Sequence, residues 1–168
     1  MAVRVRKDYE AGTFAGFFGE DVVLMPVPGS TPRKDNNALW VSERICRALL
    51  VEGLAGSMLP NIKRDYPVPK SAFQSPGNRP NVKTHYDSMS VQDELLEPTR
   101  ILLVDDIVTK GCTLLACASR VQEAFPDADV RSFAMVRTMG LVPDIDVIKA
   151  ACVGRITERP GYDADRLP

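Results

Sequence analysis

The sequence contains no apolar run long enough to cross a membrane and no marked excess of charge of either sign. A membrane-spanning helix needs about 20 largely apolar residues, and no stretch of this chain approaches that length. The formal net charge is -1, whereas proteins that bind nucleic acid by neutralising its phosphates usually carry an excess of Lys and Arg. We therefore expect no membrane span, and the composition does not indicate nucleic-acid binding, although it leaves room for a local basic patch.

Side chains that bind transition metals are scarce as well. The chain has one histidine, His85, and four cysteines, Cys46, Cys112, Cys117 and Cys152, which form no CxxC pair. Because structural zinc sites use clustered Cys and His, a zinc site is not expected. Scattered thiols are typical of a reducing compartment, and the first residues lack the apolar stretch of a signal peptide. These features predict a cytoplasmic protein.

The rest of the composition is that of a globular domain. Hydrophobic residues make up 45% and charged residues 26% of the 168 residues, as in ordinary globular proteins. No internal repeat is visible, so we predict one domain over 1–168 with a core at about 20–157. A stretch at about 67–92 is rich in Pro, Ser and Asn and lacks periodicity, which predicts a mobile flap with a short hairpin around 85–91 and an exposed His85. A polar tail at about 158–168 is expected to be disordered in part or to cover the site.

Short apolar runs bounded by turn residues alternate with helical patterns. Strands are expected at 22–28, 59–66, 100–104, 130–137 and 147–156, the second and last of them weakly. One helix is expected from a cap at Asn36 or Asn37 to about Leu54, with Val41, Ile45, Ala48 and Leu49 on its apolar face. Another is expected from Thr113 to Phe125, where Pro126 follows. This alternation predicts an α/β domain with a mainly parallel sheet flanked by helices.

The segment from Ile101 to Thr113 carries the clearest chemical signal. It reads Ile-Leu-Leu-Val-Asp-Asp-Ile-Val-Thr-Lys-Gly-Cys-Thr, so a buried strand leads into two acids and then a short loop before a helix. Ligands bind beyond the carboxyl ends of parallel strands, and loop amides at a helix N-terminus suit a phosphate. Asp105 and Asp106 would repel a phosphate, but they suit sugar hydroxyls or a magnesium shell. The segment therefore predicts a sugar-phosphate site.

Three other interpretations are weaker. A strand that ends in Val-Asp-Asp also resembles a Walker B element, but the chain has no GxxxxGK[ST] loop to accompany it. It also resembles the start of a receiver domain, for which too few residues follow Asp106. A plain solvated acidic turn would not explain the Thr-Lys-Gly-Cys-Thr sequence that directly precedes a helix.

The same segment resembles the signature of type I phosphoribosyltransferases, in which an apolar strand, two acids and two apolar residues precede Thr-x-Gly-x-Thr. The resemblance implies a type I phosphoribosyltransferase-like fold with a flap or hood. It also implies that Asp105 and Asp106 are catalytic and contact the ribose hydroxyls of 5-phosphoribosyl-1-pyrophosphate (PRPP), and that they hold Mg²⁺ directly, through water or through those hydroxyls. The 5-phosphate is then expected on Thr109, Lys110, Gly111, Cys112 and Thr113.

The order of features over roughly 21–138 resembles the ComF-like branch of this family, although the loop after the first strand differs from that branch and the zinc module often found there is missing. This wider resemblance implies that the loop after the first strand, a basic pair and the flap meet the pyrophosphate. The residues implied are Pro28, Gly29, Arg33, Lys34, Lys63, Arg64, Arg79 and Lys83. In this hypothesis basic residues neutralise the leaving pyrophosphate as the flap closes.

The resemblance implies a pentosyltransferase that transfers the phosphoribosyl group to a nitrogen acceptor and releases pyrophosphate, in nucleotide metabolism. The acceptor is not identified by any pattern, and relatives of this type suggest a homodimer. The unusual loop after the first strand keeps a second hypothesis open: a non-catalytic, PRPP-responsive regulatory protein, similar to competence proteins, that acts on DNA or on a protein partner.

Overall fold

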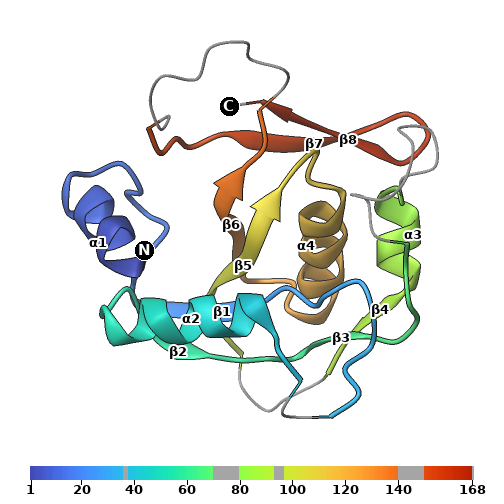
Figure 1. Ribbon diagram of the computed structural model, residues 1–168, viewed down its shortest axis with the longest axis horizontal. Helices are drawn as coiled ribbons and strands as arrows, with labels where there is room; N and C mark the ends of the chain where they lie inside the picture. Colours follow the sequence, from blue (N-terminus) through green and yellow to red (C-terminus); the bar gives the residue numbers. More distant parts are fainter. Residues whose placement is uncertain (36–37, 70–79, 93–96, 140–149, 168) are drawn as a thin grey trace.

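A computed structural model describes residues 1–35, 38–69, 80–92, 97–139 and 150–167. Its centre is a four-stranded parallel sheet of order β2-β1-β5-β6 (Figure 1). The strands are β1 (Gly19–Pro26), β2 (Ala55–Met58), β5 (Arg100–Val108) and β6 (Asp129–Arg137). The predicted α/β class with a mainly parallel sheet is confirmed.

Helices pack on both faces of this sheet, and β5 alternates its side chains between them. Ile101 and Leu103 belong to one apolar cluster with residues of α4 (Cys112–Ala124). Leu102 and Val104 belong to a second cluster with residues of α2 (Val41–Val51). Because successive side chains of a strand point to opposite faces, a strand covered on both sides must be apolar throughout. This explains the continuous apolar run at the start of β5.

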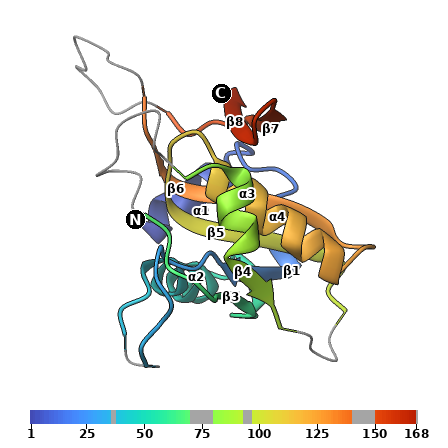
Figure 2. The same cartoon turned by 90° about the vertical axis from the view of Figure 1, so that its right-hand side faces the viewer.

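The N-terminal segment adds a helix that the sequence did not predict. Helix α1 (Ala2–Glu10) and the turns after it lie on the same side of the sheet as α2 (Figures 1 and 2). Phe14 and Phe18 pack edge-to-face against Phe133 of β6, an arrangement that adds to simple burial. The few apolar residues of α1 gave no clear helical period, because only Ala2 and Val5 are buried.

Helix α2 begins later than predicted and turns a different face to the sheet. The predicted caps, Asn36 and Asn37, lie outside the described residues, and the helix starts at Val41 with Trp40 as its cap. Val41 is exposed, whereas Ser42 is buried. The predicted apolar face was wrong at this end because the first turn of α2 lies beside the carboxyl end of β5, where a hydroxyl finds a polar partner.

Residues 70–79 of the predicted flap lie outside the described residues, and the part that follows them contains a helix where a hairpin was expected. Asn81 caps α3 (Val82–Asp87) by accepting a hydrogen bond from the amide of Thr84 at 2.9 Å, as N-cap residues do. Strand β4 (Met89–Val91) follows and pairs antiparallel with β3 (Ile62–Arg64). The strand expected at 59–66 is therefore shorter and lies outside the main sheet, and the hairpin expected around 85–91 was wrong.

The last strands form an antiparallel pair, β7 (Arg155–Arg159) with β8 (Asp163–Leu167). This pair lies across the carboxyl ends of β5 and β6 (Figure 1). The expected strand at 147–156 starts in residues that are not described, and its end joins β7 instead of the parallel sheet. Of the tail predicted at 158–168, Gly161 and Asp163 line a cavity that is described below. None of the helices in the described part of the chain is long and apolar enough to cross a membrane.

Gly56 allows β2 to lie directly against β1. A Cβ atom at Gly56 would lie 2.0 Å from the backbone oxygen of Glu20, so Gly56→Ala must displace one of the two strands. We expect it to lower the free energy of unfolding by about 1–3 kcal/mol, measured by urea denaturation. Gly29→Ala is the matched control, since a Cβ there meets nothing within 4 Å. Equal stability of the two variants would contradict this packing.

Candidate functional site

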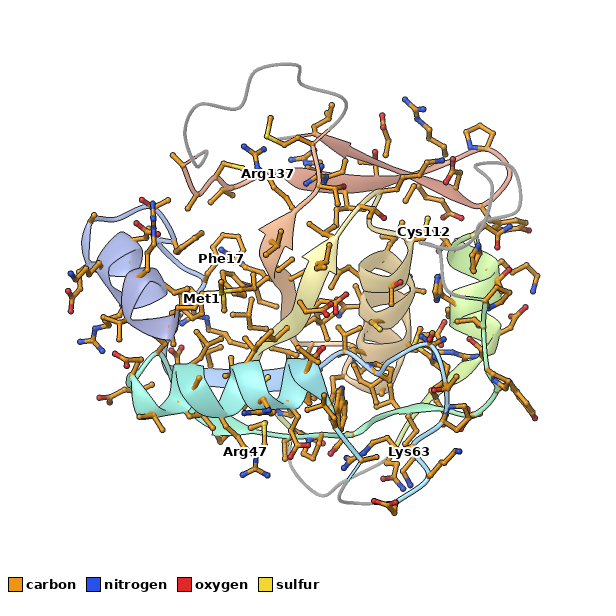
Figure 3. The ribbon with its side chains drawn as sticks, in the orientation of Figure 1. Met1, Phe17, Arg47, Lys63, Cys112 and Arg137 are labelled. Atoms are coloured by element: carbon orange, nitrogen blue, oxygen red, sulfur yellow. The ribbon has the colours of Figure 1, made fainter. Side chains whose placement is uncertain are left out.

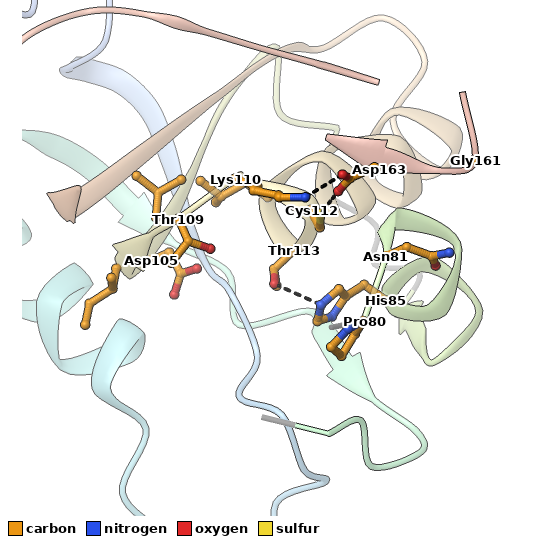
Figure 4. Close-up of a pocket in the computed structure, with 14 residues that line it drawn as sticks. Pro80, Asn81, His85, Asp105, Thr109, Lys110, Cys112, Thr113, Gly161 and Asp163 are labelled. Atoms are coloured by element: carbon orange, nitrogen blue, oxygen red, sulfur yellow. Dashed lines mark hydrogen bonds and ion pairs between the residues drawn. The ribbon is translucent and has the colours of Figure 1, made fainter. Parts of the chain in front are cut away.

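A cavity of about 320 Å³ lies beyond the carboxyl end of β5 (Figure 4). Its floor is formed by Asp105, Ile107 and Val108 of β5, and its wall by the loop and first turn of α4 at 109–114. Pro80, Asn81 and His85 close a second side, and Gly161 and Asp163 close a third. The structure thus brings three separate parts of the sequence to the place where parallel sheets bind ligands.

The turn from β5 into α4 is shorter than predicted, because the strand continues to Val108 and the helix begins at Cys112. Gly111 between them has a positive φ of 99°, which L-residues with a side chain rarely adopt. A Cβ atom there would also lie 2.7 Å from Cδ1 of Ile156 in β7. Both the backbone angle and the contact with β7 therefore require glycine.

The start of α4 offers hydrogen-bond donors. Its first intrahelical bond runs from the amide of Leu115 to the carbonyl of Gly111 at 2.9 Å, so the amides of Cys112, Thr113 and Leu114 have no partner within the helix. All three residues line the cavity. Free amides together with the positive end of the helix dipole favour an anion such as a phosphate monoester.

The two acids have different environments. Asp105 lines the cavity, and its Oδ1 accepts hydrogen bonds from the amide of Asp106 at 2.9 Å and from Oγ of Ser42 at 3.4 Å. Burial raises the pKa of Asp105 to about 7, and the neighbouring charge of Asp106 adds to this effect. Asp106 does not line the cavity, and its Oδ1 accepts from the amide of Ile107. Since neighbours in a strand point to opposite faces, only Asp105 is placed at the phosphate loop.

All five predicted residues of the phosphate loop line the cavity: Thr109, Lys110, Gly111, Cys112 and Thr113. Asp163 of β8 contacts two of these residues. Its carboxylate pairs with the ammonium of Lys110 and lies 3.7 Å from the thiol of Cys112 (Figure 4). The ammonium of Lys110 lowers the pKa of Asp163. The pair β7–β8 is thereby attached to the loop by an ion pair and by Ile156.

Of the residues predicted to meet pyrophosphate, those that the structure describes do not line this cavity. Arg64 is buried and holds structure together: it donates to the carbonyl of Gly29 at 2.9 Å, to the carbonyl of His85 and to Oγ of Ser88. Its side chain would have to break these bonds to move toward a ligand, so its role at pyrophosphate stays a prediction. Lys63 is exposed and lies well away from Cys112 (Figure 3).

The other basic candidates have partners or lie elsewhere. The guanidinium of Arg33 lies 4.9 Å from the ring centroid of Trp40 and 3.8 Å from a carboxylate oxygen of Glu43. Lys83 pairs with Asp87 on the surface of α3. Remaining predicted positions are Lys34, which is exposed, Pro28, which is buried, and Arg79, which lies outside the described residues.

Sequence reasoning favoured an exposed His85 over a catalytic one, and it gave Asp163 and Ser42 no role in the site. His85 was expected in an exposed loop, yet its side chain is buried and faces the cavity. The Asn-Val-Lys-Thr pattern at 81–84, with Asn as a helix cap, was a usable signal for α3. No local pattern could have revealed Asp163 and Ser42, because they reach the site through tertiary packing.

The described residues contain no group of three or more Asp, Glu, His or Cys side chains that could form a metal site by themselves. Magnesium seldom needs such a group, since it keeps several waters and uses one or two carboxylates with substrate oxygens. Asp105 fits this role because its buried carboxylate borders the cavity beside a second acid. The residues present are therefore compatible with Mg²⁺ bound together with a ligand.

The buried imidazole of His85 should make stability depend on pH. Burial, with the nearby charge of Arg64, lowers its pKa to about 4, whereas an unfolded chain has a value near 6.5. Between these values the unfolded state binds the extra proton, so stability falls as pH decreases from about 6.5 to about 4. Over this pH range His85 lowers the free energy of unfolding by up to about 3 kcal/mol.

We expect His85→Gln to show a shallower decline over that pH range in urea denaturation, because glutamine does not titrate. Acidic residues contribute the same slope to both proteins and cancel in the difference. Parallel profiles of wild type and variant would show that His85 titrates normally.

No family model and no curated protein sequence matches the chain at a significant level. Among solved structures, the chain is similar to a crystal structure of a hypoxanthine phosphoribosyltransferase from Staphylococcus aureus. The similarity has a TM-score of 0.43 at 10% sequence identity and covers 82% of this chain and 72% of that one. A similarity of this size has no weight for the function, which must be inferred from the site.

Proposed function

We propose that the chain is a phosphoribosyltransferase that binds PRPP with Mg²⁺ and transfers the phosphoribosyl group to a nitrogen acceptor, with release of pyrophosphate. The observation that carries the proposal is the shared cavity of the Asp105 carboxylate and the anion-binding start of α4. A carboxylate that accepts hydrogen bonds from a diol and amides that donate to a phosphate fit the two ends of a ribose 5-phosphate.

In this proposal the 5-phosphate lies on the loop 109–113. The amides of Cys112 and Thr113 donate to its oxygens, and the hydroxyls of Thr109 and Thr113 add two more donors. Gly111 lets the backbone approach the ligand closely. The ribose then extends toward Asp105, at the end of the cavity formed by β5.

Asp105 has two tasks in this proposal. Its carboxylate accepts hydrogen bonds from ribose hydroxyls and orients the ring. As the bond to pyrophosphate breaks, positive charge develops on the ribose, and a preorganised negative charge in a partly buried site stabilises that charge. Asp106 acts from the neighbouring position of β5, through its charge and by supporting the backbone at Ile107.

Bound with the substrate, Mg²⁺ would neutralise charge on the leaving pyrophosphate. Asp105, with Asp106 through water, is the group of this chain that would hold it. The raised pKa of Asp105 is consistent with a carboxylate that gains a cation when the substrate binds.

A second candidate function keeps the ligand but omits the reaction: a PRPP-responsive binding protein that acts on DNA or on a protein partner. One observation favours it. Arg64 is held in the interior, and Arg33 is engaged with Trp40 and Glu43, so these cations of the described chain are not poised at the cavity to neutralise a leaving group.

Binding of PRPP to the protein is tested by calorimetric titration in the presence of Mg²⁺. We expect saturable binding by wild type and binding weaker by roughly tenfold or more in Asp105→Asn, because a hydrogen bond to a charged group is lost. A smaller loss is expected for Asp106→Asn, which lies outside the cavity. Asp129→Asn is the matched control, since Asp129 lies at the opposite end of β6 and pairs with Arg131. Equal losses in Asp105→Asn and Asp129→Asn would contradict the site.

Turnover separates the two functions. We expect release of pyrophosphate from PRPP and Mg²⁺ in the presence of a suitable purine, pyrimidine or amine acceptor, and loss of that release in Asp105→Asn. Binding of PRPP without release for any acceptor of the panel would favour the regulatory protein instead. A wild type that binds no PRPP while folded would exclude both.

A further inference from the structure

His85 is a buried polar residue that the proposed reaction does not use. It lies on α3, its side chain is only 5% exposed, and it borders the cavity beside Thr113 (Figure 4). Helix α3 packs against α4, so the imidazole is held against the first turn of the helix that offers the anion site.

The two ring nitrogens have different surroundings. Nε2 lies 3.4 Å from Oγ1 of Thr113. Nδ1 is buried and has no hydrogen-bond partner among the described residues. The charged group facing the ring from β3 is Arg64, which also donates to the carbonyl of His85. A cation beside a buried ring keeps the imidazole neutral at pH 7, so one nitrogen carries a hydrogen and the other does not.

The burial of Nδ1 decides which nitrogen carries the hydrogen. A hydrogen on Nδ1 would leave a buried N–H without an acceptor, and such orphaned donors are rarer in proteins than incompletely satisfied acceptors. A hydrogen on Nε2 instead finds the oxygen of Thr113 within reach. The protein therefore favours the Nε2–H form.

We propose that His85 is a positioning residue that donates from Nε2 to Oγ1 of Thr113 and so leaves the hydroxyl hydrogen of Thr113 free to donate to a phosphate oxygen of the ligand. The inference rests on the proposed sugar-phosphate function and adds a residue to it.

The direction of this hydrogen bond matters for an anion. A threonine hydroxyl has one hydrogen and two acceptor lone pairs. If Nε2 accepted that hydrogen, Thr113 would present only lone pairs to the cavity, and these repel a phosphate oxygen. When His85 donates, Thr113 becomes a donor to the ligand, in line with the amides of Cys112 and Leu114 beside it. Hydrogen bonds to a charged acceptor are the stronger kind.

The tautomer can be measured directly, because His85 is the single histidine of the chain. Nitrogen-15 NMR of the wild-type protein at pH 7 reports which ring nitrogen is protonated. We expect the Nε2–H form. The Nδ1–H form, or an imidazolium, would overturn the inference, whatever the protein binds.

Two substitutions test the consequence for binding. The amide nitrogen of His85→Gln reaches the position of Nε2 and can still donate to Thr113, whereas that of His85→Asn reaches only the position of Nδ1. With ribose 5-phosphate as the calorimetric probe, we expect binding within about twofold of wild type for His85→Gln and roughly tenfold weaker binding for His85→Asn. Circular dichroism verifies that both variants are folded.

The double variant His85→Asn/Thr113→Val completes a cycle. If His85 acts through Thr113, the double variant should bind no more weakly than Thr113→Val alone. Equal losses of affinity in His85→Gln and His85→Asn, or additive losses in the double variant, would overturn the positioning role of His85. Either result would leave the sugar-phosphate site in place. A folded wild type that does not bind ribose 5-phosphate would overturn the proposed function, and with it the effect of His85 on ligand binding. The direction of the His85–Thr113 hydrogen bond would still be tested by the tautomer measurement.

Discussion

Strand β5 lies at the centre of the parallel sheet and is covered on both faces, and the geometry of the site depends on this burial. Ile101 and Leu103 face α4, while Leu102 and Val104 face α2. A slip of one residue would exchange the side chains that pack on α4 with those that pack on α2, and it would turn Asp105 to the other face. The end of the strand is therefore fixed, and with it the position of Asp105 and the direction in which the chain enters α4.

The buried side chain of Arg64 connects the wall formed by α3 to the loop after β1. It joins the loop after β1, through Gly29, to the end of α3, through His85 and Ser88. A buried guanidinium is tolerated because carbonyl and hydroxyl oxygens satisfy its donors. This network keeps α3 against α4 and holds His85 at Thr113, so a residue that resembled a mobile ligand-binding cation is part of the scaffold.

The third wall is supplied by the antiparallel pair β7–β8. Ile156 lies over Gly111, and Asp163 pairs with Lys110. An exposed ion pair contributes little to stability, so this part of the wall is held mainly by apolar contacts such as Ile156 and Ala164. The cavity thus combines a rigid floor, made by β5 and α4, with a wall from the end of the chain.

The sequence by itself determined the parallel sheet, the strand at Ile101 and the short loop between that strand and the next helix, because these depend on local patterns: apolar runs, acids after a strand, and a glycine before a helix. It also indicated the helix that follows. Only the tertiary structure decided the separation of Asp105 from Asp106 and the buried role of Arg64. It also brought His85 and Asp163 to the cavity and Ser42 to the carboxylate of Asp105. Burial and hydrogen bonding between distant segments override local secondary-structure preference at such positions. Periodicity in the sequence does not indicate which distant segments will be in contact.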